Sequence, residues 1–431
     1  KLMIQDSVKP VATTLWLLLL LIGSRESVWA DDAKSLFREY SNRIYQIRII
    51  DRSSGKQASI GSGFLITAEG LLITNYHVIS DYAHQPERFN VEFVTHDGQQ
   101  GALSLINIDV VNDLALLKLD VTPGYFIELA DSLPAHGESI YSIGNPHDIG
   151  WTVIPGTYNG IAAYSFYERI HFSGSVNPGM SGGPVLNDSG RVIGVNVATA
   201  GNQLSFLVPL NRVAAFVQTS SETEFDVATG RDAIAQQLRT NQREVIGKLV
   251  DANWETAPFG DATVPSEIAS QVRCWGYSDD DPDISYSHAA TTCNSEEQIH
   301  LSDGFTTGNV AYQFNWLESE TLNAMQFYNM YSEKIAKAYA DNEAGKEDVT
   351  EFVCHDGFIE SASLSSTKIV TKSTFCVREY KKYPQLFDVL FFGASVHLET
   401  KALISHFTIA GVEKGLAIAF LRKFVESVRW N

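Results

Sequence analysis

The chain has 431 residues and a hydrophobic content of 44%, which is normal for a folded protein. Domains typically hold about 100–200 residues, so this length predicts two or three of them. The formal net charge of −19 at pH 7 argues against nucleic acid or an anionic membrane surface as a partner, since both require a basic face on the protein.

The first 30 residues have the pattern of a secretory signal peptide. Lys1 and Lys9 lie in a polar head, an apolar run covers 11–22, and Val28 and Ala30 are small residues at positions −3 and −1 of a cleavage site. The apolar run is shorter than the roughly 20 residues that a spanning helix needs. We expect an exported protein, periplasmic or secreted, with no stable membrane span after signal cleavage. An uncleaved anchor is the alternative.

Residues 31–219 contain many short apolar stretches separated by turn residues. A short helix is expected over 33–41 and a first strand over 44–50, whose apolar residues alternate. Further strands are expected over 63–66, 71–74, 90–94, 103–110 and 114–119, then over 139–143, 151–164, 169–172, 185–186, 191–198 and 205–208, before a helix over 211–219. This series is typical of closed β-barrels, so we expect a mainly β fold with two barrels.

Three short motifs in this segment supply His, Asp and Ser in that order. His77 follows the strand over 71–74, Asp113 precedes the strand over 114–119, and Ser181 lies in the string NPGMSGGP at 177–184. A serine nucleophile needs a base that takes its proton and a carboxylate that orients the base, and this order is that of chymotrypsin-like double barrels. Taken singly, each residue has an ordinary structural explanation, such as a glycine–proline turn or a packed histidine.

The segment over 36–219 resembles the trypsin-like domain of HtrA/Deg-type serine proteases. Besides the three motifs, the strings GSGF at 61–64, IGNP at 143–146, VIGVN at 192–196 and LSFLVP at 204–209 carry the resemblance. It implies that Ser181 attacks a peptide carbonyl, that His77 acts as general base and then acid, and that Asp113 orients His77. The N–H groups of Gly179 and Ser181 would hold the oxyanion.

The resemblance also bears on partners and specificity. It implies polypeptide substrates, either unfolded or envelope proteins, with no metal and no organic cofactor, and it is compatible with a homo-oligomer. Val176, Ala200 and Leu204 would surround the S1 pocket, and Ser175, six residues before the nucleophile, offers no carboxylate for a basic side chain. We therefore expect cleavage after Val, Ile, Ala, Leu or Met.

Met180 departs from the family pattern. HtrA proteins usually carry Asn at this position and pancreatic-type proteases carry Asp, which pairs with a newly cleaved N-terminus. Because Met180 cannot make that ion pair, we expect no zymogen of the trypsin type.

The second half of the chain has no such resemblance. Residues 220–230, rich in Ser, Thr and acidic residues, are the expected linker, and 231–431 are expected to form a separate α+β domain without a recognisable PDZ loop. Helices are expected over 231–250, 321–339 and 412–428, and strands over 309–316, 386–392 and 401–409.

All four cysteines of the chain lie in this second half. In an exported protein an even number favours disulfides, and no spacing typical of a zinc site is present. Pairing of sequence neighbours, Cys274 with Cys293 and Cys354 with Cys376, is the simplest of three possibilities. Each pair would begin one of two diverged copies of a unit of disulfide, strands and helix, and coincidence is the alternative.

These patterns predict an exported serine endopeptidase. The alternative is a weakly active or inactive protease-like binding or chaperone protein of the cell envelope, suggested by Met180 and the long second half. That half would recruit substrates or partners, or restrain the protease, or merely cap the barrel. On this view a chain truncated near residue 225 remains a soluble protease.

Overall fold

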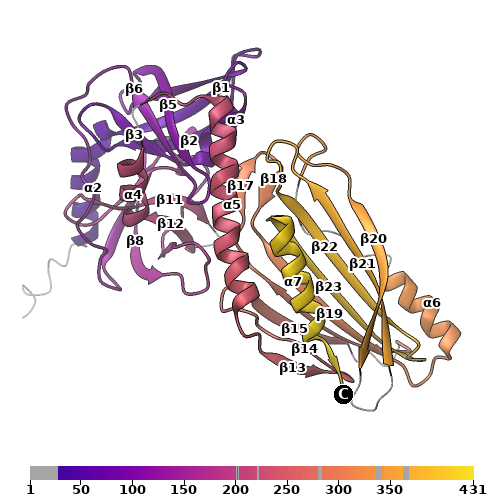
Figure 1. Cartoon of the computed structure of the whole chain (residues 1–431). Coiled ribbons are helices and arrows are strands. Elements are labelled where there is room, and N and C mark those ends of the chain that lie inside the picture. The colour runs from indigo at the N-terminus through magenta and orange to yellow at the C-terminus, as the bar shows by residue number, and fades with distance from the viewer. Residues whose placement is uncertain are drawn as a thin grey trace, which may run out of the picture.

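The computed structural model describes residues 28–431 apart from 200, 202, 221–222, 280–283, 336–341, 343 and 363–367. Most of the expected signal peptide, and Ala200 of the expected S1 pocket, therefore lie outside the described residues. Within the described residues, no helix is long and apolar enough to cross a membrane. Two parts lie side by side, a pair of barrels and a large sheet flanked by helices (Figure 1).

The first barrel closes in the strand order β1-β2-β3-β6-β5-β4. Its strands are β1 (Ile44–Asp51), β2 (Lys56–Leu65), β3 (Leu71–Thr74), β4 (Phe89–Val94), β5 (Gln100–Asp109) and β6 (Leu114–Leu119). Alternate residues such as Ile47 and Ile49 are completely buried inside, as the two-residue period of a strand requires. β2 begins earlier than predicted because its first half pairs with the end of β1.

The second barrel closes in the order β10-β11-β12-β9-β8-β7. Its strands are β7 (Ser139–Gly144), β8 (Thr152–Ile161), β9 (Ile170–Phe172), β10 (Pro184–Leu186), β11 (Val192–Thr199) and β12 (Ser205–Pro209). The ring of Phe172 fills the interior where Gly156 and Gly174 leave room, since a Cβ on either glycine would come within 2.4 Å of ring atoms. The prediction of a mainly β, two-barrel fold is confirmed.

Short helices accompany the barrels. Helix α3 (Tyr76–His84) follows β3 directly, and the 3-10 helix η2 (Pro146–Asp148) follows β7. Helix α2 (Val28–Tyr40), with the 3-10 helix η1 (Ser41–Arg43), precedes the first barrel, and α4 (Leu210–Thr219) follows the second.

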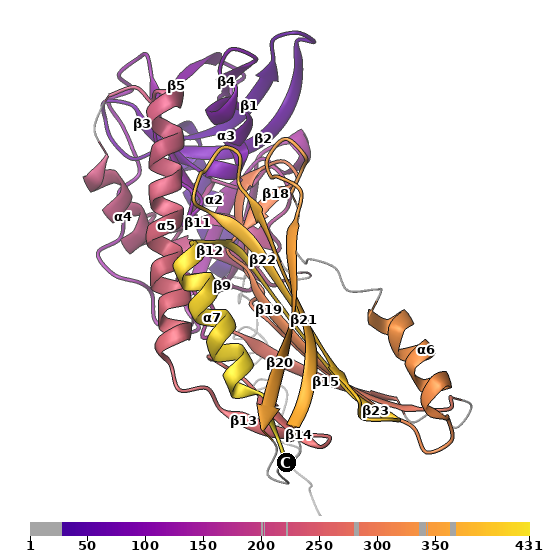
Figure 2. The same ribbon diagram turned by 45° about the vertical axis from the view of Figure 1, so that its right-hand side comes forward.

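A long helix, α5 (Val227–Asp251), lies between the two parts (Figures 1 and 2). It begins inside the segment predicted to be a linker. Its first half contributes Ile234 and Leu238 to the core of the first barrel, whereas its second half contributes Val245 and Leu249 to the core of the C-terminal part. One apolar stripe at helical spacing therefore packs against both parts.

The C-terminal part is built on a seven-stranded antiparallel sheet in the order β15-β16-β19-β23-β22-β21-β20. Its strands are β15 (Arg273–Asp279), β16 (Ser287–Asn294), β19 (Val310–Glu318), β20 (Val353–Ala362), β21 (Lys368–Glu379), β22 (Phe387–Val396) and β23 (Lys401–Val412). Helix α7 (Lys414–Ser427) packs on one face, where the ring of Phe424 stacks on Phe314 with centroids 5.3 Å apart. Helix α6 (Ala324–Ile335) packs near one end of the sheet (Figure 2).

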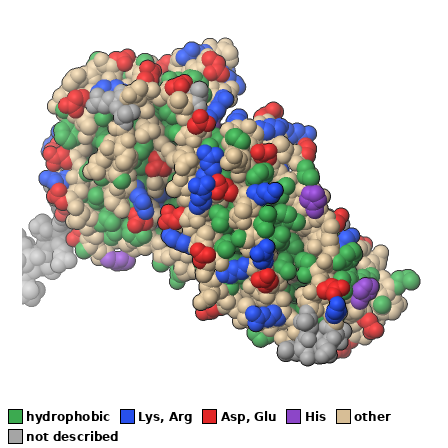
Figure 3. Space-filling view, in the orientation of Figure 1, with side chains coloured by type: hydrophobic (Ala, Val, Ile, Leu, Met, Phe, Trp, Pro, Cys, Tyr) green, Lys and Arg blue, Asp and Glu red, His purple; other side chains and the backbone are tan. Residues whose placement is uncertain are grey.

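Smaller strands complete this part. β13 (Thr256–Phe259), β14 (Ala262–Pro265) and β24 (Arg429–Trp430) form a three-stranded sheet. On the face drawn in Figure 3, acidic and basic side chains are interspersed and do not gather into a large area of one sign.

Two disulfides join Cys274 to Cys293 and Cys354 to Cys376, the neighbouring pairs expected from the sequence. The members of each pair are directly opposite each other in a hairpin, β15–β16 in one case and β20–β21 in the other. These hairpins occupy the two edges of the seven-stranded sheet.

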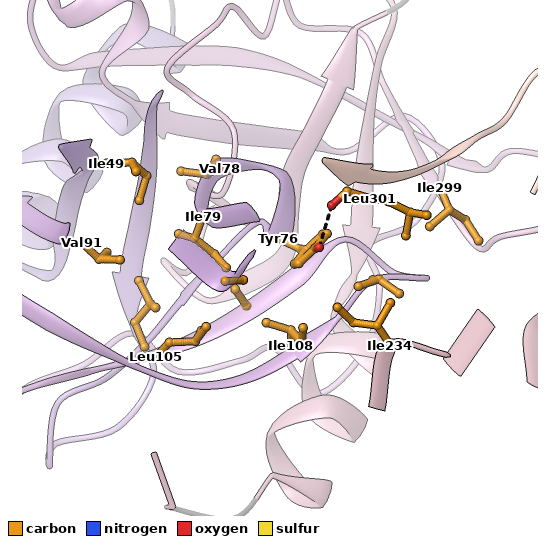
Figure 4. Packing of buried hydrophobic residues seen from close by; sticks show 14 of the residues in the cluster. Ile49, Tyr76, Val78, Ile79, Val91, Leu105, Ile108, Ile234, Ile299 and Leu301 are labelled. Carbon is orange, nitrogen blue, oxygen red and sulfur yellow. Dashed lines mark hydrogen bonds between the residues drawn. The ribbon is translucent and has the colours of Figure 1, made fainter. Parts of the chain in front are cut away.

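A further hairpin of the C-terminal part, β17 (Ile299–Ser302) and β18 (Phe305–Thr307), packs on the first barrel. Ile299, Leu301 and Phe305 are buried in the same apolar cluster as Tyr76 of α3. Figure 4 shows Ile299 and Leu301 beside Tyr76. The C-terminal part thus has its own sheet and its own core, and it also shares a second core with the barrel.

Candidate active site

His77, Asp113 and Ser181 come from three different elements. His77 is the second residue of α3, Asp113 lies in the turn between β5 and β6, and Ser181 lies in the loop before β10. The two barrels meet here, because the N–H of Ser62 on β2 donates to the Ser181 carbonyl at 2.8 Å. The site is therefore assembled by the packing of one barrel on the other.

Asp113 holds His77 at two points. Oδ2 lies 2.6 Å from the ring Nδ1, and Oδ1 accepts the backbone N–H of His77 at 2.9 Å. Asp113 itself has a φ of +62°, a left-handed conformation that Asp tolerates better than most residues. Its carbonyl accepts the amide of Asn75 at 2.8 Å. Both ends of the aspartate are thus fixed by the segment that leads into α3.

The pKa of His77 is the result of opposing effects. Burial lowers it, but the charge of Asp113 and the hydrogen bond that the ring donates to Asp113 raise it, and the net result is a pKa above the usual value of 6.5. A carboxylate on Nδ1 leaves Nε2 as the ring nitrogen that can accept a proton. His77 is therefore suited to act as a general base.

Ser181 lies in a loop pressed against the segment that precedes His77. Gly182 has a φ of +83°, and a Cβ there would come within 2.3 Å of Thr74 Oγ1 and 2.8 Å of the Asn75 nitrogen, so this position requires glycine. The Ser181 hydroxyl donates its hydrogen bond to the carbonyl of Val197 at 3.4 Å. Among the contacts of the described residues, none joins Ser181 to His77.

The same loop offers two free backbone donors. The Pro178 carbonyl accepts the N–H of His147 at 2.8 Å, which turns the following N–H, that of Gly179, to the opposite side of the trans peptide. Within the described chain, neither Gly179 nor Ser181 donates its N–H to any acceptor. Unpaired donors beside a nucleophile are what an oxyanion hole consists of.

Met180, between these donors, is completely buried in the core of the second barrel. Its carbonyl accepts the side-chain amide of Asn196 at 3.2 Å, and the neighbouring Gly179 carbonyl accepts the Ser62 hydroxyl at 2.7 Å. The apolar side chain of Met180 and these hydrogen bonds therefore anchor the loop, without an ion pair at position 180.

The residues expected around S1 are only partly placed. Val176 is buried in the core of the second barrel, and its N–H donates to Ser205 Oγ at 3.2 Å. Leu204 is half-buried, and Ser175 is exposed. Among the described residues, no group of three or more His, Cys, Asp or Glu side chains is placed to hold a metal ion.

Sequence patterns did not indicate that the C-terminal half contacts a loop of the second barrel. The Glu297 carboxylate accepts the N–H of Phe166 at 2.9 Å, and Asn241 of α5 donates to the Tyr167 hydroxyl at 3.0 Å. These contacts hold the loop between β8 and β9. Neither Glu297 nor Asn241 belongs to a motif, so no local signal could have identified them.

Two more charged or titratable residues lie close to the triad. Burial lowers the pKa of Arg169, and the charge of Asp113 opposes that shift. His300, from the β17–β18 hairpin, has its ring centroid 6.1 Å from that of His77. Both were missed from the sequence, because their roles depend on neighbours distant along the chain.

Comparisons with known proteins find relatives of part of this chain. A family model described as a trypsin-like peptidase domain matches residues 61–195. The chain is 31% identical over 169 residues, 37% of its length, to a probable periplasmic serine endoprotease DegP-like from Chlamydia trachomatis, of which the match covers 33%. A protein of the same description from Rickettsia prowazekii is 32% identical over 208 residues, covering 44% of this chain and 39% of that protein.

The chain thus spans between a third and two fifths of the length of these relatives. Among solved structures, the serine endoprotease from Yersinia pestis is similar over 43% of this chain and 65% of its own, with 24% identity and a TM-score of 0.39. The family match at residues 61–195 lies within the two barrels, so this part of the chain resembles a trypsin-like peptidase domain, and the relatives named above are serine endoproteases of the DegP-like kind.

Proposed function

We propose that this protein is an exported serine endopeptidase that hydrolyses peptide bonds with His77, Asp113 and Ser181. Its substrates are polypeptides, in particular unfolded proteins or proteins of the cell envelope. Names of the relatives support this reading, since they describe periplasmic serine endoproteases. Export is supported further by the signal-like pattern of the first 30 residues.

One observation carries the proposal. A histidine held by a carboxylate at 2.6 Å and two unpaired N–H groups are present around a single serine. A structural role would require neither the unpaired donors nor a buried carboxylate on the ring, because unpaired polar groups cost stability. Acyl transfer requires both a histidine held by a carboxylate and unpaired N–H donors near the serine.

The reaction would begin with a rotation of the Ser181 side chain. The Ser181 hydroxyl, which now donates to the Val197 carbonyl, would move to another staggered rotamer and donate to Nε2 of His77. His77 then accepts the proton as Ser181 Oγ attacks the peptide carbonyl, and the N–H groups of Gly179 and Ser181 bind the oxyanion. His77 returns the proton to the leaving amine, and water hydrolyses the acyl-enzyme by the same steps.

Asp113 would stabilise the imidazolium that forms during attack. Its two contacts to His77 fix the tautomer and the direction of the ring at once, so little reorganisation is needed when charge develops. The raised pKa of His77 makes it a stronger base.

Specificity would come from an apolar S1 pocket around Val176, Ala200 and Leu204. The exposed Ser175 provides no negative charge for Arg or Lys. We expect cleavage after Val, Ile, Ala, Leu or Met, with a broad preference, because one methylene changes the discrimination by only about 1–3 kcal/mol. A peptide-library profile dominated by Arg or Lys would contradict this assignment.

The decisive experiment is labelling with a fluorophosphonate probe, followed by mapping of the modified residue. The parent protein should be labelled at Ser181 and should cleave casein, and Ser181→Ala should lose both properties while keeping its unfolding temperature. Loss of the nucleophile should reduce cleavage by several powers of ten. Ser189→Ala, at an exposed serine in a turn, is the matched control and should behave as the parent.

A binding or chaperone-like protein is the second candidate. It is favoured by the hydrogen bond of the Ser181 hydroxyl to Val197, which leaves the serine unactivated. In that case the parent takes no label at any pH and cleaves nothing, yet still suppresses the aggregation of an unfolded protein.

A further inference from the structure

The β17–β18 hairpin of the C-terminal half makes direct contact with the helix that carries His77. Leu301 is completely buried in the core of the first barrel, together with Tyr76 (Figure 4). Its carbonyl accepts the Tyr76 hydroxyl at 2.7 Å and lies 2.9 Å from Nε2 of His84. Tyr76 and His84 are the first and last residues of α3, so one carbonyl of the hairpin contacts side chains at both ends of the helix.

The preceding residue, His300, reaches the backbone of His77 through one side chain. Nε2 of His300 lies 3.1 Å from the hydroxyl of Ser80, and that hydroxyl donates to the His77 carbonyl at 3.3 Å. With the Ser80 proton on the carbonyl, Nε2–H of His300 is the donor of the other bond, which the Nε2–H tautomer of the ring allows. A chain of two hydrogen bonds thus runs from the hairpin to His77.

The ring of His300 also lies against the neighbouring rings. Its centroid is 6.1 Å from that of His77 and 6.3 Å from that of Tyr76, both in edge-on arrangements. Burial lowers the pKa of His300 to about 4, so the ring is neutral near pH 7 and places no positive charge beside the imidazolium of His77. The contact is therefore compatible with proton transfer at His77.

We propose that His300 is a positioning residue of the active site, through which the C-terminal half holds His77 in its productive place. The inference rests on the proposed protease function. Asp113 fixes the N–H and the ring of His77, and the chain from His300 fixes its carbonyl. Because the N–H, the ring and the carbonyl of His77 are all held, the ring keeps its direction when Ser181 turns toward it. Misplacement by about 1 Å can cost a hundredfold in rate.

This role differs from simple capping of the barrel. A cap needs only the apolar residues of the hairpin, such as Leu301 and Phe305, which are buried whatever the side chain at 300. A positioning role instead needs a donor at the place of Nε2. Glutamine has its amide nitrogen the same number of bonds from Cα as Nε2 of histidine, whereas the amide nitrogen of asparagine is one bond shorter.

The test compares His300→Gln, His300→Asn and His300→Ala in the full-length protein, with fluorophosphonate labelling as the readout. The maximal inactivation rate should fall about 10- to 100-fold in the Ala and Asn variants, with an unchanged inhibition constant of the probe. The Gln variant should stay within about threefold of the parent, because it restores the donor. Ser80→Ala, which breaks the chain but leaves the ring, should resemble His300→Ala.

His288→Ala is the matched control. His288 is also half-buried with one hydrogen bond, to Asn315 at 2.9 Å, but it lies in the C-terminal sheet, so its loss should not change the labelling rate. Equal rates for the parent and for folded Ala, Asn and Ser80→Ala variants would overturn the inference while leaving the protease function intact. A fall of equal size in the Gln variant would overturn it as well, as it would indicate a structural role. If the parent is not labelled, the proposed function fails, and this inference fails with it.

Discussion

The hydroxyl of Tyr76 donates a 2.7 Å hydrogen bond to the carbonyl of Leu301, 225 residues further along the chain. Both residues are buried, and the bond joins α3, the helix that carries His77, to a hairpin of the C-terminal half. The two halves are therefore coupled at the site where the chemistry would take place.

Tyr76→Phe should lower the free energy of unfolding by about 1 kcal/mol, the usual net contribution of one hydrogen bond. The Leu301 carbonyl keeps His84 Nε2 as a partner at 2.9 Å, so no acceptor is left unpaired and the loss stays small. Urea denaturation measures the difference. Tyr383→Phe is the control, because its hydroxyl is buried and has no partner among the described residues, and its removal should leave stability equal or higher. Equal stability of both variants would mean that the Tyr76 bond contributes nothing.

Asp113→Asn should change both the rate and its dependence on pH. In the parent, kcat/KM should rise with pH through an apparent pKa above 6.5, because His77 accepts a proton only when neutral. The Asn variant loses the charge that raises this pKa, so burial dominates and the rising limb should move to lower pH. The rate itself should fall about 10,000-fold.

A pH–rate profile of hydrolysis or labelling checks this expectation. Asp131→Asn, at an exposed carboxylate that pairs with Arg191, should change neither the rate nor the position of the rising limb. A rising limb that stays in place in Asp113→Asn would show that another group is the base.

Met180→Asn introduces the residue usual in HtrA proteins into an apolar site. Met180 is completely buried among residues such as Ile140 and Phe172, so an amide there would lack partners, and the free energy of unfolding should fall by about 2–3 kcal/mol. Met180→Leu conserves volume and should cost less than about 1.5 kcal/mol. Denaturation curves of the two variants measure the difference in stability. An Asn variant as stable as the Leu variant would contradict the burial of position 180 in an apolar site.

Each disulfide should contribute about 3 kcal/mol, since it closes a loop of sequence separation 19 or 22 residues. The paired replacements of Cys274 with Cys293, and of Cys354 with Cys376, by alanine test the two bridges separately in urea. Peptide mapping without reduction should recover these two pairs, and a linkage between 274 and 354 or between 293 and 376 would contradict the structure.

Truncation after residue 225 should not leave a stable protease. It would remove Ile234, Leu238, Leu301 and Phe305 from the apolar cluster around Tyr76 and expose that cluster to water. We expect lower solubility and a lower unfolding temperature than in the full chain, measured by sedimentation and calorimetry. The sequence led to the opposite expectation, that a chain truncated near residue 225 remains a soluble protease. A soluble truncated protein with full labelling of Ser181 would support that expectation and contradict this prediction.

The sequence by itself determined the parts of this protein that depend on local chemistry. The order of His77, Asp113 and Ser181 predicted the two-barrel fold, because this order and these motifs occur together on one backbone arrangement. The glycines of the nucleophile loop were readable for the same reason, since Gly179 and Gly182 both take positive φ angles. Alternating strands and the periodic apolar residues of α5 and α7 were readable as well.

Only the tertiary structure decided how the two halves meet. β19 and β23 pair side by side although Val310 and Ile409 are far apart in sequence, and no local pattern encodes such pairing. His300 looks like any half-exposed histidine until folding brings it beside Ser80 and His77. Met180 is only a departure from the family pattern in the sequence, whereas folding buries its side chain completely in the core of the second barrel. A residue's conformational and chemical preferences depend on its own side chain and can be read from the sequence. Its burial and its contacts depend on the elements that pack around it.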